Sequence, residues 1–77
     1  MNLTPTERDI LVHLLLRGDD RAVNIAEETD RHRVSISQRA SDLENKELLR
    51  NKGNGVYSLT LAGLTAARDI MDDRCNG

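Results

Sequence analysis

The side chains best suited to binding phosphates are gathered in the middle of the sequence. Residues 31–52 hold six basic and three acidic side chains, a net charge of +3, although the whole chain carries −2. Residues 1–30 carry −4 and residues 53–77 carry −1. Because affinity for a polyanion depends on the local charge of a surface and not on the total, this division predicts one face suited to a nucleic-acid backbone.

Hydroxyl and amide side chains are interleaved with these cations. Gln38 can pair with N6 and N7 of an adenine in the major groove, and the small serines permit close approach to bases and phosphates. Guanidinium groups at the start of a helix lie at the positive end of its dipole, which also favours a phosphate. We predict DNA contacts for ten residues: Arg31, Arg33, Ser35, Ser37, Gln38, Arg39, Ser41, Arg50, Lys52 and Asn54.

Two positions in this stretch have an alternative role. Arg39 is equally able to form an internal ion pair with a carboxylate such as Asp42 or Glu44. Val34 either touches a thymine methyl group or packs against the preceding helix. Both alternatives remain open from the sequence alone.

Other kinds of chemistry find no support in the sequence. It has no Gly-rich phosphate loop, no Ser/His/Asp set and no pair of carboxylates with an apolar pocket to shift a pKa. His13, His32 and Cys75 share no metal-ligand spacing. Tyr57 is the only aromatic residue, which nearly excludes the stacking platforms of single-strand binders, and we expect it to pack at the base of a hairpin. We therefore predict no enzyme, no cofactor and no metal.

The first third of the chain predicts two helices. Thr4 as N-cap, a proline at the first helical position and Glu7 closing a capping box predict a helix over 5–17. Gly18 suits its end. After a short polar connection, the apolar Ile25 and Ala26 with Glu27 and Glu28 facing outward predict a second helix over 22–29.

The middle of the chain predicts the helix that carries most of the candidate residues. Over 33–46, Ile36, Ala40 and Leu43 fall on one helical face and should point into the core. The opposite face carries Val34, Gln38, Ser41 and Asn45.

The last third predicts a hairpin and a closing helix. Two apolar-rich runs within 48–59 flank Asn54-Gly55, a pair that accepts the positive φ angles of a tight turn. Thr60 can cap a last helix over 61–73, where apolar residues recur every three or four positions.

This order of elements predicts a winged helix-turn-helix, mostly α with a small β-hairpin wing. Seventy-seven residues leave no room for a second core, so we expect a single domain over 1–77. In this architecture the third helix enters the major groove and the hairpin tip approaches the adjacent backbone or minor groove. Those two places carry five of the 11 arginines and lysines of this sequence.

The chain resembles the small winged-helix repressors of archaeal phages and plasmids, typified by the phi-H phage repressor, and more loosely the MarR-type regulators. The resemblance covers about residues 8–65. It is carried by IAEE at 25–28, VSISQRASDLE at 34–44, LL at 48–49 and, most specifically, GNGVYSLT at 53–60 with Gly63. Asp30 and Glu47 depart from the pattern at positions where Gly is common. The resemblance implies a sequence-specific, DNA-binding transcription regulator, a homodimeric repressor of archaeal or viral origin.

The first and last helices carry more apolar residues than one core should require. We predict a twofold homodimer through these helices, which would place two recognition helices about 34 Å apart on an inverted-repeat site. The alternative is a monomer whose last helix covers its own core. The predicted interface consists of Leu3, Val12, Leu16, Leu61, Leu64, Ala67, Ile70 and Met71.

A second function is compatible with the same fold. A winged helix can serve as a protein-docking module of the transcription machinery, in which case the acidic first two helices would be the working face. The single cysteine and the absence of an apolar run near 18 residues predict a cytoplasmic protein that does not contact membranes. The partner that the sequence favours is double-stranded DNA.

Overall fold

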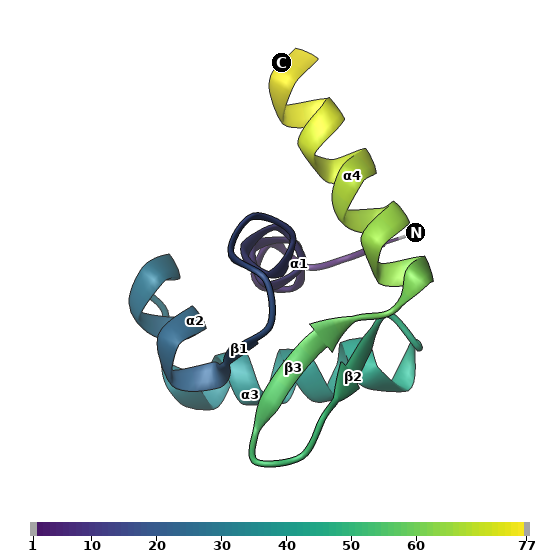
Figure 1. Cartoon of the computed structure of the whole chain (residues 1–77). Coiled ribbons are helices and arrows are strands. Elements are labelled where there is room, and N and C mark those ends of the chain that lie inside the picture. The colour runs from purple at the N-terminus through teal and green to yellow at the C-terminus, as the bar shows by residue number, and fades with distance from the viewer. Residues whose placement is uncertain (1, 77) are drawn as a thin grey trace.

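Residues 2–76 are described by the computed structural model, with side chains from 2 to 74. Over this range the chain forms four helices and a three-stranded antiparallel sheet, which is a winged-helix fold (Figure 1). The elements in chain order are α1 (Pro5–Arg17), β1 (Asp20–Arg21), α2 (Ala22–Thr29), α3 (Arg33–Asn45), β2 (Leu49–Asn51), β3 (Val56–Leu59) and α4 (Leu61–Asn76).

Helix α1 occupies the centre of the molecule. The predicted capping box is present: Glu7 N–H donates to Thr4 Oγ1 at 3.2 Å, and Thr4 N–H donates to Glu7 Oε1 at 3.0 Å. Ile10 and Leu11 are fully buried and join apolar residues of every other helix in one core. The remaining helices and the sheet are therefore arranged around α1.

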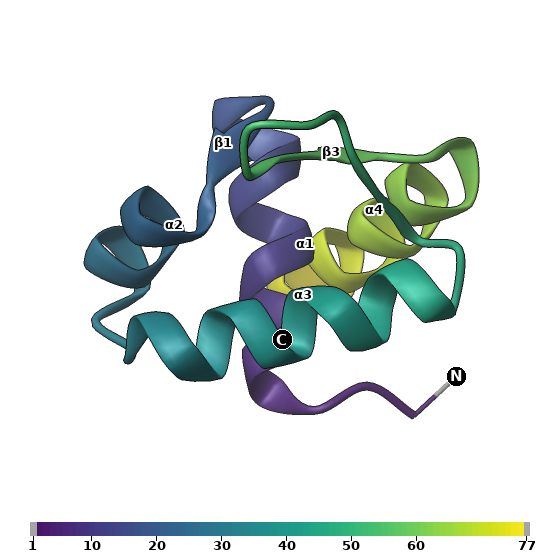
Figure 2. The same cartoon turned by 90° about the horizontal axis from the view of Figure 1, so that it is seen from below.

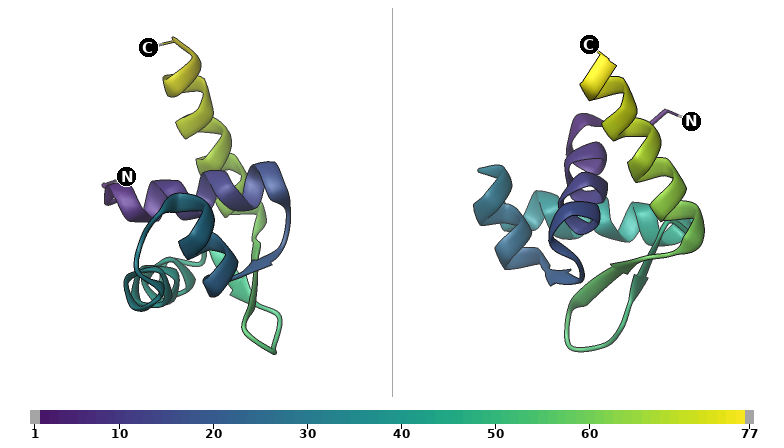
Figure 3. Two further views of the ribbon diagram at one scale, coloured as in Figure 1. Left: turned by 90° about the vertical axis from the view of Figure 1, so that its left-hand side faces the viewer. Right: turned by 45° about the horizontal axis from the view of Figure 1, so that its top comes forward.

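Helix α3 crosses below α1 with its predicted apolar face inward. Ile36, Ala40 and Leu43 are each 0% exposed. Figure 2, which views the molecule from this side, shows α3 and the hairpin extending across the face, with α4 behind them. The hairpin projects beyond the helices (Figure 3). Helix α3 and the hairpin thus lie at one end of the molecule, and the end of α4 lies at the other (Figure 1).

The sheet contains a strand that the sequence analysis missed. We expected a polar connection at 19–21, but Asp20 and Arg21 form β1 and pair with Tyr57 and Val56 of β3. The strand order is β1-β3-β2. Two polar residues carry no β signal of their own, since this pairing depends on the free edge that β3 offers from a distant part of the chain.

Each helix of the helix-turn-helix is followed by a left-handed residue that is not glycine. Asp30 has φ 56° after α2, and Glu47 has φ 64° after α3. At the end of α3, Leu48 N–H donates to Leu43 O at 2.9 Å, and Glu47 N–H donates to Glu44 O at 2.9 Å. This is a Schellman motif, and it ends α3 at Asn45, one residue before the predicted boundary.

Helix α4 begins where Thr60 caps it and continues beyond the predicted end at residue 73. Gly63 N–H donates to Thr60 Oγ1 at 3.0 Å, as a capping threonine requires. A side chain at Gly63 would collide with the carbonyl oxygen of Leu48, so glycine here permits close packing of α4 on the start of the hairpin.

A buried carboxylate joins α1 to the end of α3. Glu7 is 2% exposed, and its Oε2 lies 2.8 Å from Lys46 Nζ. Burial by itself raises the pKa of the Glu7 carboxyl, but hydrogen bonds from Lys46 and Thr4 outweigh it, so the pKa is lowered overall. Glu7 is therefore held ionised inside the fold.

We expect Glu7→Gln to reduce the free energy of unfolding near neutral pH by about 1–3 kcal/mol, because the pairing with Lys46 loses its charge. Since the pKa of Glu7 is lower in the folded chain than in the unfolded one, its ionised form stabilises the fold above the ordinary value of 4.5. That contribution is lost as the pH falls through the lower folded pKa. Urea unfolding at neutral and at strongly acidic pH should show a difference between the two proteins that narrows in acid.

The exposed Glu44 offers a matched control on α3. Glu44→Gln should leave both the stability and its pH dependence close to those of the parent. An unchanged pH dependence in Glu7→Gln would contradict the role given to Glu7.

Candidate nucleic-acid interface

The outward face of α3 packs against nothing in the described chain. Its central positions are Val34, Gln38, Ser41 and Asn45, all of them exposed. They form a strip without charge, opposite the buried face of the helix. Uncharged amide and hydroxyl groups on a projecting helix are suited to the donors and acceptors on base edges.

The structure gives the ten predicted DNA-contact residues different degrees of exposure. Ser37, Arg31 and Arg39 are half-buried. The exposed ones are Arg33, Ser35, Gln38, Ser41, Arg50, Lys52 and Asn54. Among the residues described, Arg33 and Arg50 form no ion pair, so their charge is available to an external anion.

Arg31 requires a correction. Its Nη2 lies 2.9 Å from Asp9 Oδ2, and its Nη1 donates to Thr6 Oγ1 at 3.0 Å, so the guanidinium is turned toward α1. The sequence could not reveal this, because Asp9 is 22 residues earlier and meets Arg31 only when α1 packs beside the turn. A structural role in this turn replaces the predicted phosphate contact.

Arg39 follows the alternative that the sequence left open. Its Nη1 lies 3.2 Å from Asp42 Oδ2, one helical turn further along α3. Both side chains are partly exposed, at 38% and 44%. An exposed pair of this kind stabilises a helix only weakly, so Arg39 can still turn toward a phosphate.

Val34 is 61% exposed, which excludes the alternative in which it packs against α2.

The wing presents its tip through three consecutive left-handed residues. Gly53, Asn54 and Gly55 have φ angles of 94°, 57° and 75°. Gly53 N–H donates to Asn51 Oδ1 at 2.9 Å, which fixes the start of the turn. Tyr57 is 9% exposed and packs in the core, as predicted. Lys52 Nζ lies 2.8 Å from Asp19 Oδ2 in a solvent-exposed ion pair that links the wing to the end of α1.

The sheet register reveals a further cation. Asp20, Asn51 and Tyr57 are aligned across the three strands, so their neighbours Arg21 and Arg50 project from the opposite face. Arg21 is exposed and forms no ion pair with the described residues. The sequence contains little indication of this role, because a basic residue that follows two aspartates is typical of a surface turn.

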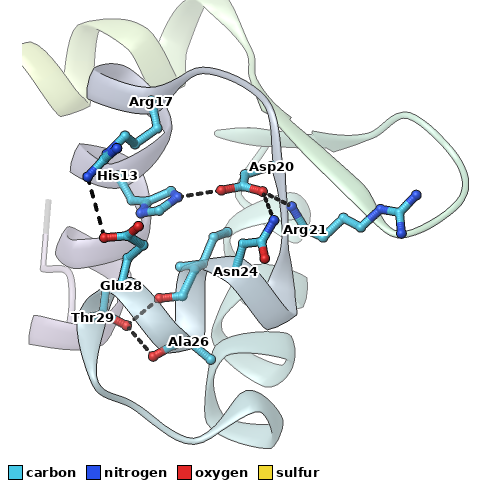
Figure 4. A network of polar contacts seen from close by, with 9 residues as sticks. His13, Arg17, Asp20, Arg21, Asn24, Ala26, Glu28 and Thr29 are labelled. Atoms are coloured by element: carbon cyan, nitrogen blue, oxygen red, sulfur yellow. Dashed lines mark hydrogen bonds and ion pairs between the residues drawn. The ribbon is translucent and has the colours of Figure 1, made fainter.

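A polar network positions β1, and with it the wing (Figure 4). His13 is 7% exposed, and its Nε2 lies 2.7 Å from Asp20 Oδ2. Asp20 Oδ1 accepts from Arg21 N–H and from Asn24 Nδ2, each at 2.8 Å. Burial alone raises the pKa of Asp20, but the hydrogen bonds from His13 and these donors outweigh it and lower the pKa overall.

The predicted dimer residues do not form one surface, and two of them require correction. Val12 and Ala67 are 7% and 0% exposed, so neither offers much surface to a partner, although Val12 borders a hollow together with Leu16. Five of the other predicted residues line hollows on the surface, and they are divided among three separate hollows. Leu3 and Ile70 line a groove of about 420 Å³ between the N-terminal segment and α4; Leu16 lines one beside α2; Leu61 and Leu64 line one near the wing.

Within the described residues, no three His, Cys, Asp or Glu side chains are grouped as metal ligands. None of the helices in this part is long and apolar enough to cross a membrane. Cys75 lies outside the residues whose side chains are described.

Solved structures resemble this chain closely in fold. ZitR from Lactococcus lactis superposes with a TM-score of 0.88 at 22% identity, over 99% of this chain and 54% of that one. The adhesin competence repressor AdcR from Streptococcus pyogenes gives 0.84 at 16%, over 97% and 60%. The transcriptional regulator Tm0710 from Thermotoga maritima gives 0.79 at 19%, over 95% and 55%.

These neighbours are winged-helix transcription regulators of the MarR type, which establishes the fold of this chain. The chain spans a little over half the length of each. No protein-family model and no curated protein sequence matches it. The resemblance to the phi-H phage repressors stays a prediction.

We expect Asp20→Ala to lower the free energy of unfolding by about 1–3 kcal/mol, because it leaves the buried His13 ring without its partner. The neighbouring Asp19 is a matched control, since its ion pair with Lys52 is exposed. Asp19→Ala should cost less than about 1 kcal/mol. Urea unfolding of the two variants measures the difference, and equal losses would show that the buried contact has no special weight.

Proposed function

We propose that this chain is a sequence-specific, double-stranded DNA-binding transcription regulator. The observation that carries the proposal is the exposed, uncharged strip on α3 that contains Gln38 and Ser41. Near it lie arginines that form no ion pair with the described residues. Arg33 lies at the positive end of α3, and Arg21 and Arg50 lie on the sheet. A helix fits the major groove of B-form DNA, where a glutamine can pair with adenine.

The two proposed contact regions have separate tasks. Ser35, Gln38 and Ser41 would read or approach base edges, while Arg33 and Arg39 at the margins of α3 would hold phosphates, with Ser37 beside them. The wing would approach the adjacent backbone or minor groove through Arg50, Lys52 and Asn54. Opening the exposed ion pairs of Arg39 and Lys52 costs little, so both cations stay in the proposed site.

We infer further that the chain is a single domain over 1–77, that it acts in the cytoplasm and that the regulation is repression. Repression is what the resemblance to phi-H phage repressors implies, and that resemblance also suggests an archaeal or viral source. The fold shared with the adhesin competence repressor AdcR is compatible with it.

We also propose that it acts as a homodimer through α1 and α4. Leu61 is 82% exposed, and the groove between the N-terminal segment and α4 is lined partly by Leu3 and Ile70. A second copy lying along α4 would cover Leu61 and the apolar part of this groove. It would place two α3 helices on successive turns of one DNA face, about 34 Å apart, which requires an inverted-repeat site.

DNA binding is tested by fluorescence anisotropy with the duplex from the chain's own promoter region and a scrambled duplex, over a range of salt. We expect promoter-selective binding whose logarithm falls with log salt at a slope near −4.5 per bound chain, for about five phosphate contacts made by each chain. Gln38→Ala should weaken selectivity by roughly 1–3 kcal/mol, and Arg50→Ala should reduce the slope by about 1.

Val23→Ala, an exposed change on α2 outside both the strip on α3 and the proposed dimer contact, is the control and should alter neither quantity. Equal and feeble binding to both duplexes, at every salt concentration where the protein is folded, would refute the proposal. It would favour the protein-docking module instead.

The dimer is tested by sedimentation equilibrium, where we expect twice the chain mass of 8.6 kDa. Leu61→Glu and Ala62→Glu, both at exposed positions on α4, should shift the equilibrium toward monomer because each places a charge in the contact. Val23→Glu, at an exposed valine on α2, should not. A parent protein that stays monomeric at all concentrations would contradict the homodimer.

A further inference from the structure

Val34 is an apolar residue at the N-terminal end of the exposed strip on α3, which is otherwise polar. It is 61% exposed, and it lies directly opposite the buried face of α3. Valine is also a poorer helix former than the straight-chain residues usual at exposed positions. Neither packing nor helix propensity therefore accounts for valine at this position.

The surroundings of Val34 show which kind of partner fits it. Gln38 follows it by one helical turn on the same strip, and Ser41 lies one turn beyond. The strip itself carries no charged side chain, and the nearest cation in sequence is Arg33. A protein partner that bound through apolar contacts would need a larger patch than one valine beside an amide and a hydroxyl.

We propose that Val34 contacts the 5-methyl group of a thymine in the major groove and so determines specificity at one base pair. This inference rests on the proposed DNA-binding function. The thymine methyl is the apolar group that a base pair presents in that groove, and apolar side chains recognise it by contact. The γ-methyl groups of Val34 supply such a contact, whereas serine or glutamine would leave the methyl group against a polar side chain.

The spacing along α3 limits where this thymine lies. Positions 34 and 38 are separated by four residues, which is about 6 Å along a helix. Successive bases on a strand are about 3.4 Å apart. With Gln38 on an adenine, Val34 therefore meets a thymine no more than about two base steps away. The recognised half-site contains both bases.

The experiment removes the methyl group from the DNA and its partner from the protein. A preferred duplex is first selected from a randomised pool with the parent protein. Each thymine in one half-site is then replaced singly by deoxyuridine, which differs only by the missing methyl. We expect one replacement to weaken binding of the parent about 3- to 5-fold, as loss of one buried methyl group predicts.

Val34→Ala should lose most of the preference for thymine over deoxyuridine, and Val34→Ile should keep it. Val23→Ala, at the exposed valine of α2, is the matched control and should keep the parent's ratio. Circular dichroism should show all variants folded, because Val34 is exposed and alanine favours helix.

The outcomes separate the two levels of the proposal. If the parent selects a sequence but no deoxyuridine replacement changes its affinity, or if Val34→Ala keeps the parent's ratio, the role of Val34 is refuted and DNA recognition stands. If the parent selects no sequence and binds no duplex, the DNA-binding function fails and the role of Val34 fails with it.

Discussion

The carboxylate of Glu7 is the constraint on which the rest of the arrangement depends. A buried, ionised group is stable only when its oxygens are hydrogen-bonded and its charge is compensated. Here Thr4 satisfies one oxygen and Lys46 the other, so the start of α1 is fixed to the end of α3. The same point on α3 leads directly into the hairpin. One buried group thereby sets the positions of both elements proposed to meet DNA.

Other polar residues of α1 also fix the positions of the elements that surround this helix. Asp9 accepts from Arg31 before α3 and from Arg74 near the end of α4, at 3.0 Å in each case. His13 holds Asp20 on β1, and Arg17 lies 3.4 Å from Glu28 on α2. These contacts also decide which cations are available outside: Arg31 is engaged within the chain, whereas Arg33 two residues later lies outside the described ion pairs.

The elements could be predicted from the sequence where local chemistry decides them. The Thr4 cap, the inward positions of α3 and the Asn54 turn depend on neighbours within a few residues. The β1 strand, the Asp9–Arg31 pair and the burial of Val12 and Ala67 depend on segments far apart in the chain, and periodicity carries no information about them. Hydrophobic spacing therefore overestimated the apolar surface left for a partner. The exposure of the candidate residues on α3 could be predicted, because the outward face of a helix follows from its inward one.

Helix α3 is bracketed by two residues, Asp30 and Glu47, whose left-handed backbone is unfavourable for any side chain with a Cβ atom. The cost is about 1–2 kcal/mol at Glu47 and smaller at Asp30, because aspartate tolerates the left-handed region better than most residues. A folded domain of this size has a free energy of unfolding of only about 5–10 kcal/mol. The backbone cost at these two residues is a substantial fraction of that amount, and the other interactions in the molecule must offset it. The native sequence therefore lies well below the stability that this backbone could reach. The two loops that flank α3 are where that margin could be recovered without altering any residue on its exposed strip.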